Sequence, residues 1–289
     1  MIPAAFDYHA PQTLPEALSL LTRLGEGAKV LSGGQSLLPL LKLRLGQVDH
    51  LVDIGRIPGL EYIKEEGGVL KIGGRTRESA LETSEIIAAR YPILLDTAKV
   101  IADPLVRNRA TVGGNLAHGD PGNDHPATML ALRATVVLTG PKGERTVPID
   151  EFFLGLFSTA LQPDEILTEI RIPTPRPRSG GAYVKLERKV GDYATAAVAV
   201  QLTLNAAGKI EQAGIALTNV GPTQRSAAAE KALIGKSPDK AALDEAARLA
   251  GEGCAPNADR RGNADYKRNM ARVLTGRALA AALKVAGGR

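Results

Sequence analysis

Two diglycine turns constrain this chain more than any other feature of its sequence. Residues 32–36 read Ser-Gly-Gly-Gln-Ser, residues 111–115 read Thr-Val-Gly-Gly-Asn, and each turn follows a short apolar run typical of a strand. Because glycine has no Cβ, its backbone can adopt a positive φ and let an anionic group approach peptide N–H groups. Two such turns suit the two phosphates of one dinucleotide cofactor. The alternative is that each pair only makes a tight turn, where glycine is common.

Stricter phosphate-binding motifs are absent from the sequence. No G-x-x-x-x-G-K-[ST] motif occurs, which disfavours a Walker-type nucleoside triphosphatase. Residues 25–27 and 251–253 begin like a G-x-G-x-x-G motif, but Val30 and Pro256 occupy the sixth positions, so a Rossmann domain is not expected. The G-x-S-x-G motif of the hydrolase nucleophile elbow is also missing. A dinucleotide site would therefore belong to another fold.

The composition is that of a protein with two or three domains. The chain has 289 residues, of which 44% are hydrophobic and 23% charged, enough for real cores. No apolar run approaches the roughly 18 residues of a membrane span, so no span is expected. The first residues lack the basic and apolar regions of an export signal, which predicts a cytoplasmic location.

Charge and cysteine content limit the chemistry. The net charge of +5 comes from 36 basic and 31 acidic residues that are interspersed, and there are only six Tyr, four Phe and no Trp for base stacking. Nucleic acid is therefore not an expected partner. Cys254 is the single cysteine, so the chain cannot hold an iron–sulfur cluster by itself. Any redox carrier on this chain must be organic.

Patterning predicts three units. Thr13 can cap a helix that Gly25 ends, and strands at 29–31 and 48–54 complete a first α/β unit. The second unit is predicted from strands at 69–72, 135–138, 146–149 and 166–172, a helix through Leu81 capped by Thr76 or Ser79, and helices at 84–90 and 93–101. Three alternate prolines within 173–181 predict a linker. Beyond it we expect strands at 182–188, 196–204 and 210–220, then helices at 223–234, 238–250 and 263–285.

Several polar residues are candidates for chemistry. His118 and His125, with Asp120 and Asp124 between them, lie in a Gly- and Pro-rich stretch that predicts an irregular loop. His and Asp side chains can bind a divalent metal ion, but the His-x6-His spacing does not fit a pair of metal ligands on one helix. The alternative is that Asp124, preferred to Asp120, binds a ribose hydroxyl, as acidic residues do in dinucleotide sites.

Other candidates are more easily explained without a functional role. The run Arg107-Asn108-Arg109 could neutralise phosphate or meet an acidic partner, or be a solvated charge cluster. Tyr193, just beyond a predicted strand, could cover a flat ring or be an ordinary tyrosine. Cys254 could be a nucleophile, but a buried structural cysteine is more common.

Three segments together resemble one known family. Residues 32–36, residues 111–115 and the run from Lys185 to Tyr193 are similar to the FAD-binding medium subunits of the molybdenum hydroxylases, the xanthine dehydrogenase family, and most closely to its aerobic carbon monoxide dehydrogenases. The resemblance extends over essentially the whole chain, including Pro-Asp-Glu-Ile-Leu at 163–167. The first loop departs from the Ala-Gly-Gly-His-Ser expected of carbon monoxide enzymes, so the resemblance predicts FAD but assigns no substrate.

The resemblance implies an α+β fold. Two subdomains form the FAD-binding fold of the vanillyl-alcohol-oxidase and peptidoglycan-reductase type, and a C-terminal α+β domain with a three-stranded sheet and helices caps the flavin. The predicted domains are residues 1–57, 58–177 and 178–289.

The resemblance also implies which residues bind FAD. The two loops are expected at the pyrophosphate, Asp124 at the ribose, and Leu167, Lys185 and Tyr193 around the ring, with Tyr193 as its aromatic cover. The complete predicted set is Val30, Leu31, Ser32, Gly33, Gly34, Gln35, Ser36, Leu37, Ile101, Thr111, Gly113, Gly114, Asn115, Asp124, Leu167, Lys185 and Tyr193. No catalytic residue and no metal ligand is predicted on this chain.

The implied enzyme is an oxidoreductase with several subunits. A large molybdopterin-binding subunit and a small [2Fe-2S] subunit are the expected partners, assembled as a dimer of heterotrimers. FAD on this chain would take electrons from the clusters and pass them to an external acceptor, which could be NAD, a quinone or oxygen. The alternatives are a self-contained FAD-dependent oxidoreductase acting on a small molecule and a binding module without turnover.

Overall fold

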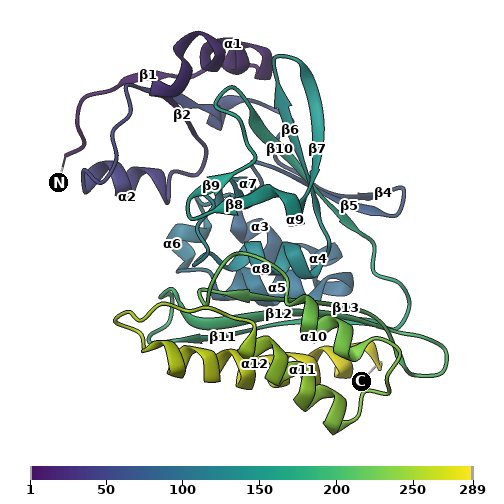
Figure 1. Ribbon diagram of the computed structural model, residues 1–289. Coiled ribbons are helices and arrows are strands. Elements are labelled where there is room, and N and C mark those ends of the chain that lie inside the picture. The colour runs from purple at the N-terminus through teal and green to yellow at the C-terminus, as the bar shows by residue number, and fades with distance from the viewer. Residues whose placement is uncertain (1, 288–289) are drawn as a thin grey trace.

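The computed structural model describes residues 2–287 as three packed units in chain order (Figure 1). The outermost ends of the first and third predicted domains, at residues 1 and 288–289, lie outside the described residues. Three clusters of buried apolar side chains hold the molecule together. The architecture is the predicted mixture of helices and sheets.

The first unit is a small parallel sheet with two helices. Its elements are β1 (Asp7–His9), α1 (Leu14–Leu24), β2 (Ala28–Leu31), α2 (Leu37–Lys42) and β3 (His50–Asp53), in the strand order β1-β3-β2. The Thr13 hydroxyl accepts a hydrogen bond from the backbone N–H of Glu16 at 3.3 Å, and Gly25 ends the helix with φ +62°. The predicted cap and stop of α1 are confirmed.

The central unit is a five-stranded antiparallel sheet with helices packed on one side. Its sheet order is β4-β5-β10-β6-β7, and β8 and β9 form a separate small hairpin. The strands are β4 (Ile63–Glu66), β5 (Val69–Gly73), β6 (Thr135–Gly140), β7 (Gly143–Pro148), β8 (Phe153–Gly155), β9 (Ser158–Thr159) and β10 (Ile166–Pro173). The helices are α3 (Glu78–Thr83), α4 (Glu85–Arg90), α5 (Pro92–Val100), α6 (Pro104–Arg107), α7 (Val112–Ala117), α8 (Asp124–Ala131) and α9 (Ile149–Phe152).

Two expectations for this unit are wrong. Neither Thr76 nor Ser79 caps α3, whose N-cap is Arg77, because the Thr76 hydroxyl donates to the backbone carbonyl of Tyr62 at 2.9 Å instead. The predicted irregular loop over residues 118–125 ends at Asn123, and Asp124 and His125 form the first turn of α8. That turn is buried, so tertiary packing outweighs the local Gly and Pro content.

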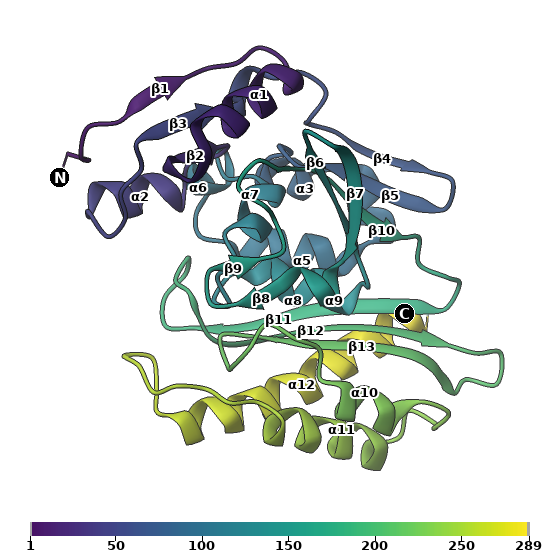
Figure 2. The same cartoon turned by 45° about the horizontal axis from the view of Figure 1, so that its top comes forward.

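The third unit is a three-stranded antiparallel sheet covered on both faces. Strands β11 (Ser179–Glu187), β12 (Ala194–Leu204) and β13 (Ile210–Thr218) precede α10 (Ala227–Leu233), α11 (Lys240–Glu252) and α12 (Ala264–Ala286). Helices α11 and α12 lie below this sheet, and α5 and α8 of the central unit lie above it (Figure 2). This double cover explains why nearly every residue of β12 is buried.

Candidate functional site

A cavity of about 620 Å³ is lined by residues of all three units. The first unit contributes residues 28–37, the central unit contributes most residues of 110–118 and 157–167, and the third unit contributes Lys185 and residues 191–193. Every residue predicted to bind the cofactor lines this cavity. The structure thus brings the whole predicted set together, while contact of each residue with FAD remains a prediction.

The two diglycine turns meet on the wall of this cavity. The Ser32 hydroxyl lies 3.0 Å from the Thr111 hydroxyl, and Thr111 Oγ1 also accepts a hydrogen bond from the N–H of Gly114 at 3.2 Å. The first turn lies so close to the chain entering the second that a Cβ on Gly33 would be 2.3 Å from the Arg109 carbonyl oxygen. Only glycine fits there without a backbone shift.

The two turns differ in the donors that they leave free. Within residues 2–287, the backbone N–H groups of residues 33–36 make no hydrogen bond, and these residues line the cavity. In the second turn, the N–H of Gly113 donates to the Gly74 carbonyl at 3.0 Å and that of Gly114 donates to Thr111. The first turn is therefore the one with free donors for an anion.

The second turn offers a different kind of group. The Asn115 side-chain oxygen Oδ1 is buried and has no hydrogen-bond partner in the described part of the chain. Asn115 lines the cavity beside the first turn. A buried acceptor without a donor is costly, so a ligand that carries a hydroxyl or N–H group fits this position.

A buried network of polar side chains adjoins the cavity, with Asp124 and Lys185 in the cavity wall. Asp124 accepts from the Tyr183 hydroxyl at 2.6 Å and from Lys185 Nζ at 3.0 Å, and Lys185 Nζ also donates to the Val100 carbonyl at 2.9 Å. Burial raises the pKa of the Asp124 carboxyl and holds the pKa of Tyr183 well above its usual value. Tyr183 was not identified as a site residue from the sequence, because its partner Asp124 lies 59 positions away and a strand pattern does not predict such a contact.

The choice of Asp124 over Asp120 agrees with this geometry. The Asp120 carboxylate accepts from the N–H of Gly122 at 2.8 Å and so closes a turn, whereas Asp124 lines the cavity. The cavity therefore combines free backbone N–H donors, a buried carboxylate with a lysine, and an aromatic side chain, Tyr193, in its wall.

Comparison with known proteins gives this geometry a family. The sequence model described as "FAD binding domain in molybdopterin dehydrogenase" matches residues 4–175, and the one described as "CO dehydrogenase flavoprotein C-terminal domain" matches residues 181–282. The carbon monoxide dehydrogenase medium chain of Hydrogenophaga pseudoflava is 50% identical over 98% of both chains. This chain belongs to the FAD-binding medium subunits of the molybdenum hydroxylases.

Related structures and more distant relatives support the same family. A carbon monoxide dehydrogenase structure from Hydrogenophaga pseudoflava superimposes with a TM-score of 0.96 at 52% identity, covering 98% of this chain and 99% of that one. The quinoline 2-oxidoreductase structure from Pseudomonas putida 86 has a TM-score of 0.92 at 34% identity and covers 99% of both chains. The 6-hydroxypseudooxynicotine dehydrogenase subunit alpha of Paenarthrobacter nicotinovorans is 38% identical over 98% of this chain and 96% of its own length.

The predictions of fold class, FAD cofactor and oxidoreductase subunit are thereby confirmed. A medium chain of a carbon monoxide dehydrogenase is one subunit of a larger enzyme with large and small subunits. In the described residues, no helix is both long and apolar enough to cross a bilayer.

The residues of the medium subunit fit FAD on three structural grounds. The free N–H groups of residues 33–36 suit a phosphate, the orphaned Asn115 oxygen suits a donor, and Lys185 and Tyr193 flank the cavity on the side of the third unit. His118 also lines the cavity, and its ring packs on Phe157 with 5.1 Å between centroids. Burial lowers the pKa of His118.

The remaining sequence candidates have structural roles. His125 is fully buried with its Nε2 2.6 Å from Glu78, so it does not share a site with His118. Arg107 pairs with Glu82 at 3.0 Å and donates to the Ile101 carbonyl. Cys254 is buried, donates to the Gly251 carbonyl, and has a pKa raised by burial. Among residues 2–287, no group of three His, Cys, Asp or Glu side chains could hold a metal ion.

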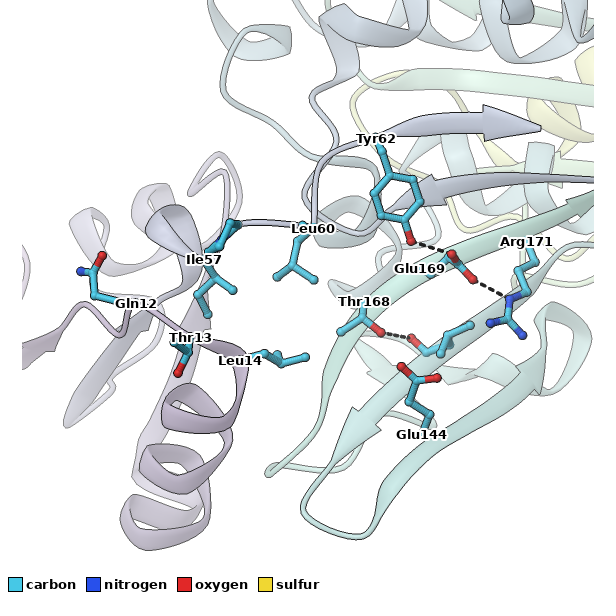
Figure 3. A pocket seen from close by; sticks show the side chains of 13 residues that line it. Gln12, Thr13, Leu14, Ile57, Leu60, Tyr62, Glu144, Thr168, Glu169 and Arg171 are labelled. Carbon is cyan, nitrogen blue, oxygen red and sulfur yellow. Dashed lines mark hydrogen bonds and ion pairs between the residues drawn. The ribbon is translucent and has the colours of Figure 1, made fainter. Parts of the chain in front are cut away.

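A second, smaller cavity of about 370 Å³ separates the first unit from the central sheet (Figure 3). Leu14 and Ile57 line one side, and Tyr62, Glu169 and Arg171 line the other. Glu169 accepts from Tyr62 and from Arg171, each at 2.5 Å. These three polar groups belong to the central unit and are hydrogen-bonded to one another.

Proposed function

We propose that this medium subunit holds FAD in the larger cavity and forms the electron exit of a molybdenum hydroxylase. The free N–H groups of residues 33–36 carry this proposal, because they are unbonded donors in the wall of a cavity of about 620 Å³. In this arrangement the first turn binds the pyrophosphate, and the second turn supplies close packing and the Asn115 acceptor.

The other cavity residues then have distinct positions. Asp124, fixed by Tyr183 and Lys185, would accept hydrogen bonds from the ribose hydroxyls of bound FAD. Ile101 and Leu167 would provide apolar contacts, and Tyr193 would cover the flavin ring. The subunit positions and electrostatically tunes its cofactor, while the redox chemistry belongs to the flavin ring.

Bound FAD supplies the ability to take electrons singly from iron–sulfur clusters and to release a pair to an acceptor. We assign the clusters to a small [2Fe-2S] subunit and substrate oxidation to a large molybdopterin subunit, since this chain has one buried cysteine and no described metal site. The assembly is a cytoplasmic dimer of heterotrimers that donates to an external acceptor, NAD, a quinone or oxygen.

The substrate is chosen on the large subunit, and carbon monoxide is the first candidate to test. Two medium chains of carbon monoxide dehydrogenases, from Hydrogenophaga pseudoflava and Afipia carboxidovorans, are 50% and 49% identical to this chain. Relatives at 38% and 36% identity belong to enzymes named for 6-hydroxypseudooxynicotine and nicotine. These relatives make an N-heterocycle the second candidate.

Anaerobic reduction of the native complex tests the proposal. The untagged chain is expected to purify with a large and a small subunit, and its flavin absorbance should bleach when carbon monoxide is added. Bleaching only with nicotine-type heterocycles would show that such a heterocycle is the substrate in place of carbon monoxide. A single flavin-containing chain that turns over a small molecule without partners would support a self-contained oxidoreductase instead.

A further inference from the structure

The loop that carries Tyr193 is held in place from outside the cavity. Residues 188–193 connect β11 to β12, and Gly191 in this loop has φ +83°. A Cβ on Gly191 would lie 2.8 Å from the Ala102 carbonyl oxygen, so the loop lies directly against the central unit. Tyr193 nevertheless remains 47% exposed. Much of Tyr193 is thus left uncovered, although its ring also lies against Gly122 of the central unit.

Arg261 makes three contacts with this loop. Its Nη2 lies 2.5 Å from Asp192 Oδ1, its Nε donates to the Tyr193 backbone carbonyl at 3.2 Å, and its guanidinium lies 5.7 Å from the centre of the Tyr193 ring. One planar side chain thus contacts the carboxylate before the tyrosine, the backbone of the tyrosine and its ring. Lysine cannot reproduce this set of contacts, because its ammonium is a single point of charge.

The turn that presents Arg261 is anchored in the third unit. Asp259 Oδ1 accepts from the N–H of Arg261 at 2.7 Å, and Asp259 Oδ2 lies 2.7 Å from Lys267 Nζ on α12. The Lys267 side chain is only 3% exposed. Asp259 and Gly262 also exchange two backbone hydrogen bonds. A buried lysine on a long helix therefore anchors the turn that presents Arg261.

We infer that Arg261 is a positioning residue that holds Tyr193 over the flavin ring and so couples the third unit to the flavin environment. This inference rests on the proposed function, since it takes Tyr193 as the cover of bound FAD. Arg261 itself does not line the cavity. Its effect passes through Tyr193, and its loss should uncover the ring without releasing the pyrophosphate from residues 33–36.

Flavin fluorescence and its quenching by iodide test this inference on the FAD-loaded full-length chain. A stacked tyrosine quenches flavin fluorescence and shields the ring. We expect Arg261→Ala to raise both the fluorescence per bound FAD and the iodide quenching constant several-fold, to the level of Tyr193→Ala, at unchanged FAD content. Arg261→Lys should give an intermediate value. Arg260→Ala is the matched control, because Arg260 is its exposed neighbour in the same turn.

A double variant separates this role from general loosening of the fold. If Arg261 acts through Tyr193, the double Arg261→Ala/Tyr193→Ala variant should equal Tyr193→Ala, because the two effects share one cause. Additive effects, or an Arg261→Ala variant that behaves like Arg260→Ala, would overturn the inference. Asp192→Asn breaks the same ion pair from the loop and serves if Arg261→Ala does not fold. A wild-type protein that contains no FAD, both as the isolated chain and in its native complex, would overturn the proposed function itself.

Discussion

The hydroxyl oxygens of Ser32 and Thr111 lie 3.0 Å apart, although 79 positions separate the two residues in the sequence. Thr111 Oγ1 also accepts from the N–H of Gly114, so one oxygen closes the second turn and touches the first. The two turns thus form one wall of the larger cavity. A substitution in either turn should therefore disturb the other turn. The first two predictions below test this coupling, and the third tests the network of Asp124 and Lys185.

Gly33→Ala should weaken FAD binding by forcing the turns apart. The new Cβ would lie 2.3 Å from the Arg109 carbonyl oxygen, and such overpacking costs about 1–3 kcal/mol. We expect FAD affinity to fall about ten-fold, which corresponds to about 1.4 kcal/mol. Flavin content after gel filtration and a fluorescence titration measure the loss. Gly46→Ala is the control, because no atom lies within 4 Å of its added Cβ; equal flavin content in both variants would contradict the prediction.

Thr111→Val should lower both stability and FAD retention. The substitution removes the N-cap of α7 and the contact with Ser32, at a cost of about 1 kcal/mol for the cap alone. Thr13→Ala removes the comparable cap of α1, which lies outside the larger cavity. Thermal unfolding should shift in both variants, but flavin content should fall only in Thr111→Val. Equal retention of flavin would show that the Ser32 contact is unimportant for binding.

Lys185→Met should destabilise the fold in a pH-dependent way. It leaves the buried Asp124 carboxylate without its cationic partner, and breaking a buried pair costs about 3–5 kcal/mol. Burial raises the pKa of Asp124 in the folded protein above the unfolded value of about 3.9. The folded state therefore holds this proton more tightly, and the cost of Lys185→Met should grow as pH rises through the folded pKa.

Urea unfolding at about pH 5 and at about pH 8 checks this sign. Asp124→Asn/Lys185→Met should recover much of the stability at the higher pH, because position 124 then no longer carries a buried charge without its cationic partner. A penalty that is independent of pH, or a double variant as unstable as Lys185→Met, would show that the network does not depend on the charge of Asp124.

Local patterns predicted those parts of the molecule whose causes are local. The diglycine turns and α1, with its Thr13 cap and Gly25 stop, follow from glycine and capping chemistry that acts over a few residues. The prediction that the site residues lie together came from the family resemblance, which relates segments that are far apart in the sequence. Strand β4 (Ile63–Glu66) was missed because its short, charge-rich sequence is that of a sheet edge.

Tertiary contacts decided what local patterns could not. Helix α7 contains Gly113 and Gly114 and forms because Thr111 caps it and Val112 and Leu116 are fully buried. The Tyr183 partner of Asp124 and the Arg261 contacts to Tyr193 each join segments more than 50 residues apart. No spacing within the sequence encodes such pairs.

Tyr62→Phe should affect stability and leave the flavin untouched. Although burial alone would raise the pKa of Glu169, donation from Tyr62 and Arg171 lowers it below the usual value. A lowered carboxyl pKa contributes stability above the unfolded pKa of about 4.3, and this contribution is lost as pH falls through the folded pKa. We expect a loss of about 1.5–3 kcal/mol near neutral pH, the range for a hydrogen bond to a charged group, and a smaller loss in acid.

Chemical unfolding at neutral and acidic pH, with flavin content measured in parallel, checks this prediction. Tyr8→Phe is the matched control, because the Tyr8 hydroxyl donates to Asp53 at 2.6 Å on a side chain that is 52% exposed, where such bonds contribute little. An equal loss at both pH values would mean that the Tyr62 hydroxyl acts by packing and not through the charge of Glu169. Loss of FAD from Tyr62→Phe would instead show that the residues of the smaller cavity affect cofactor binding in the larger one.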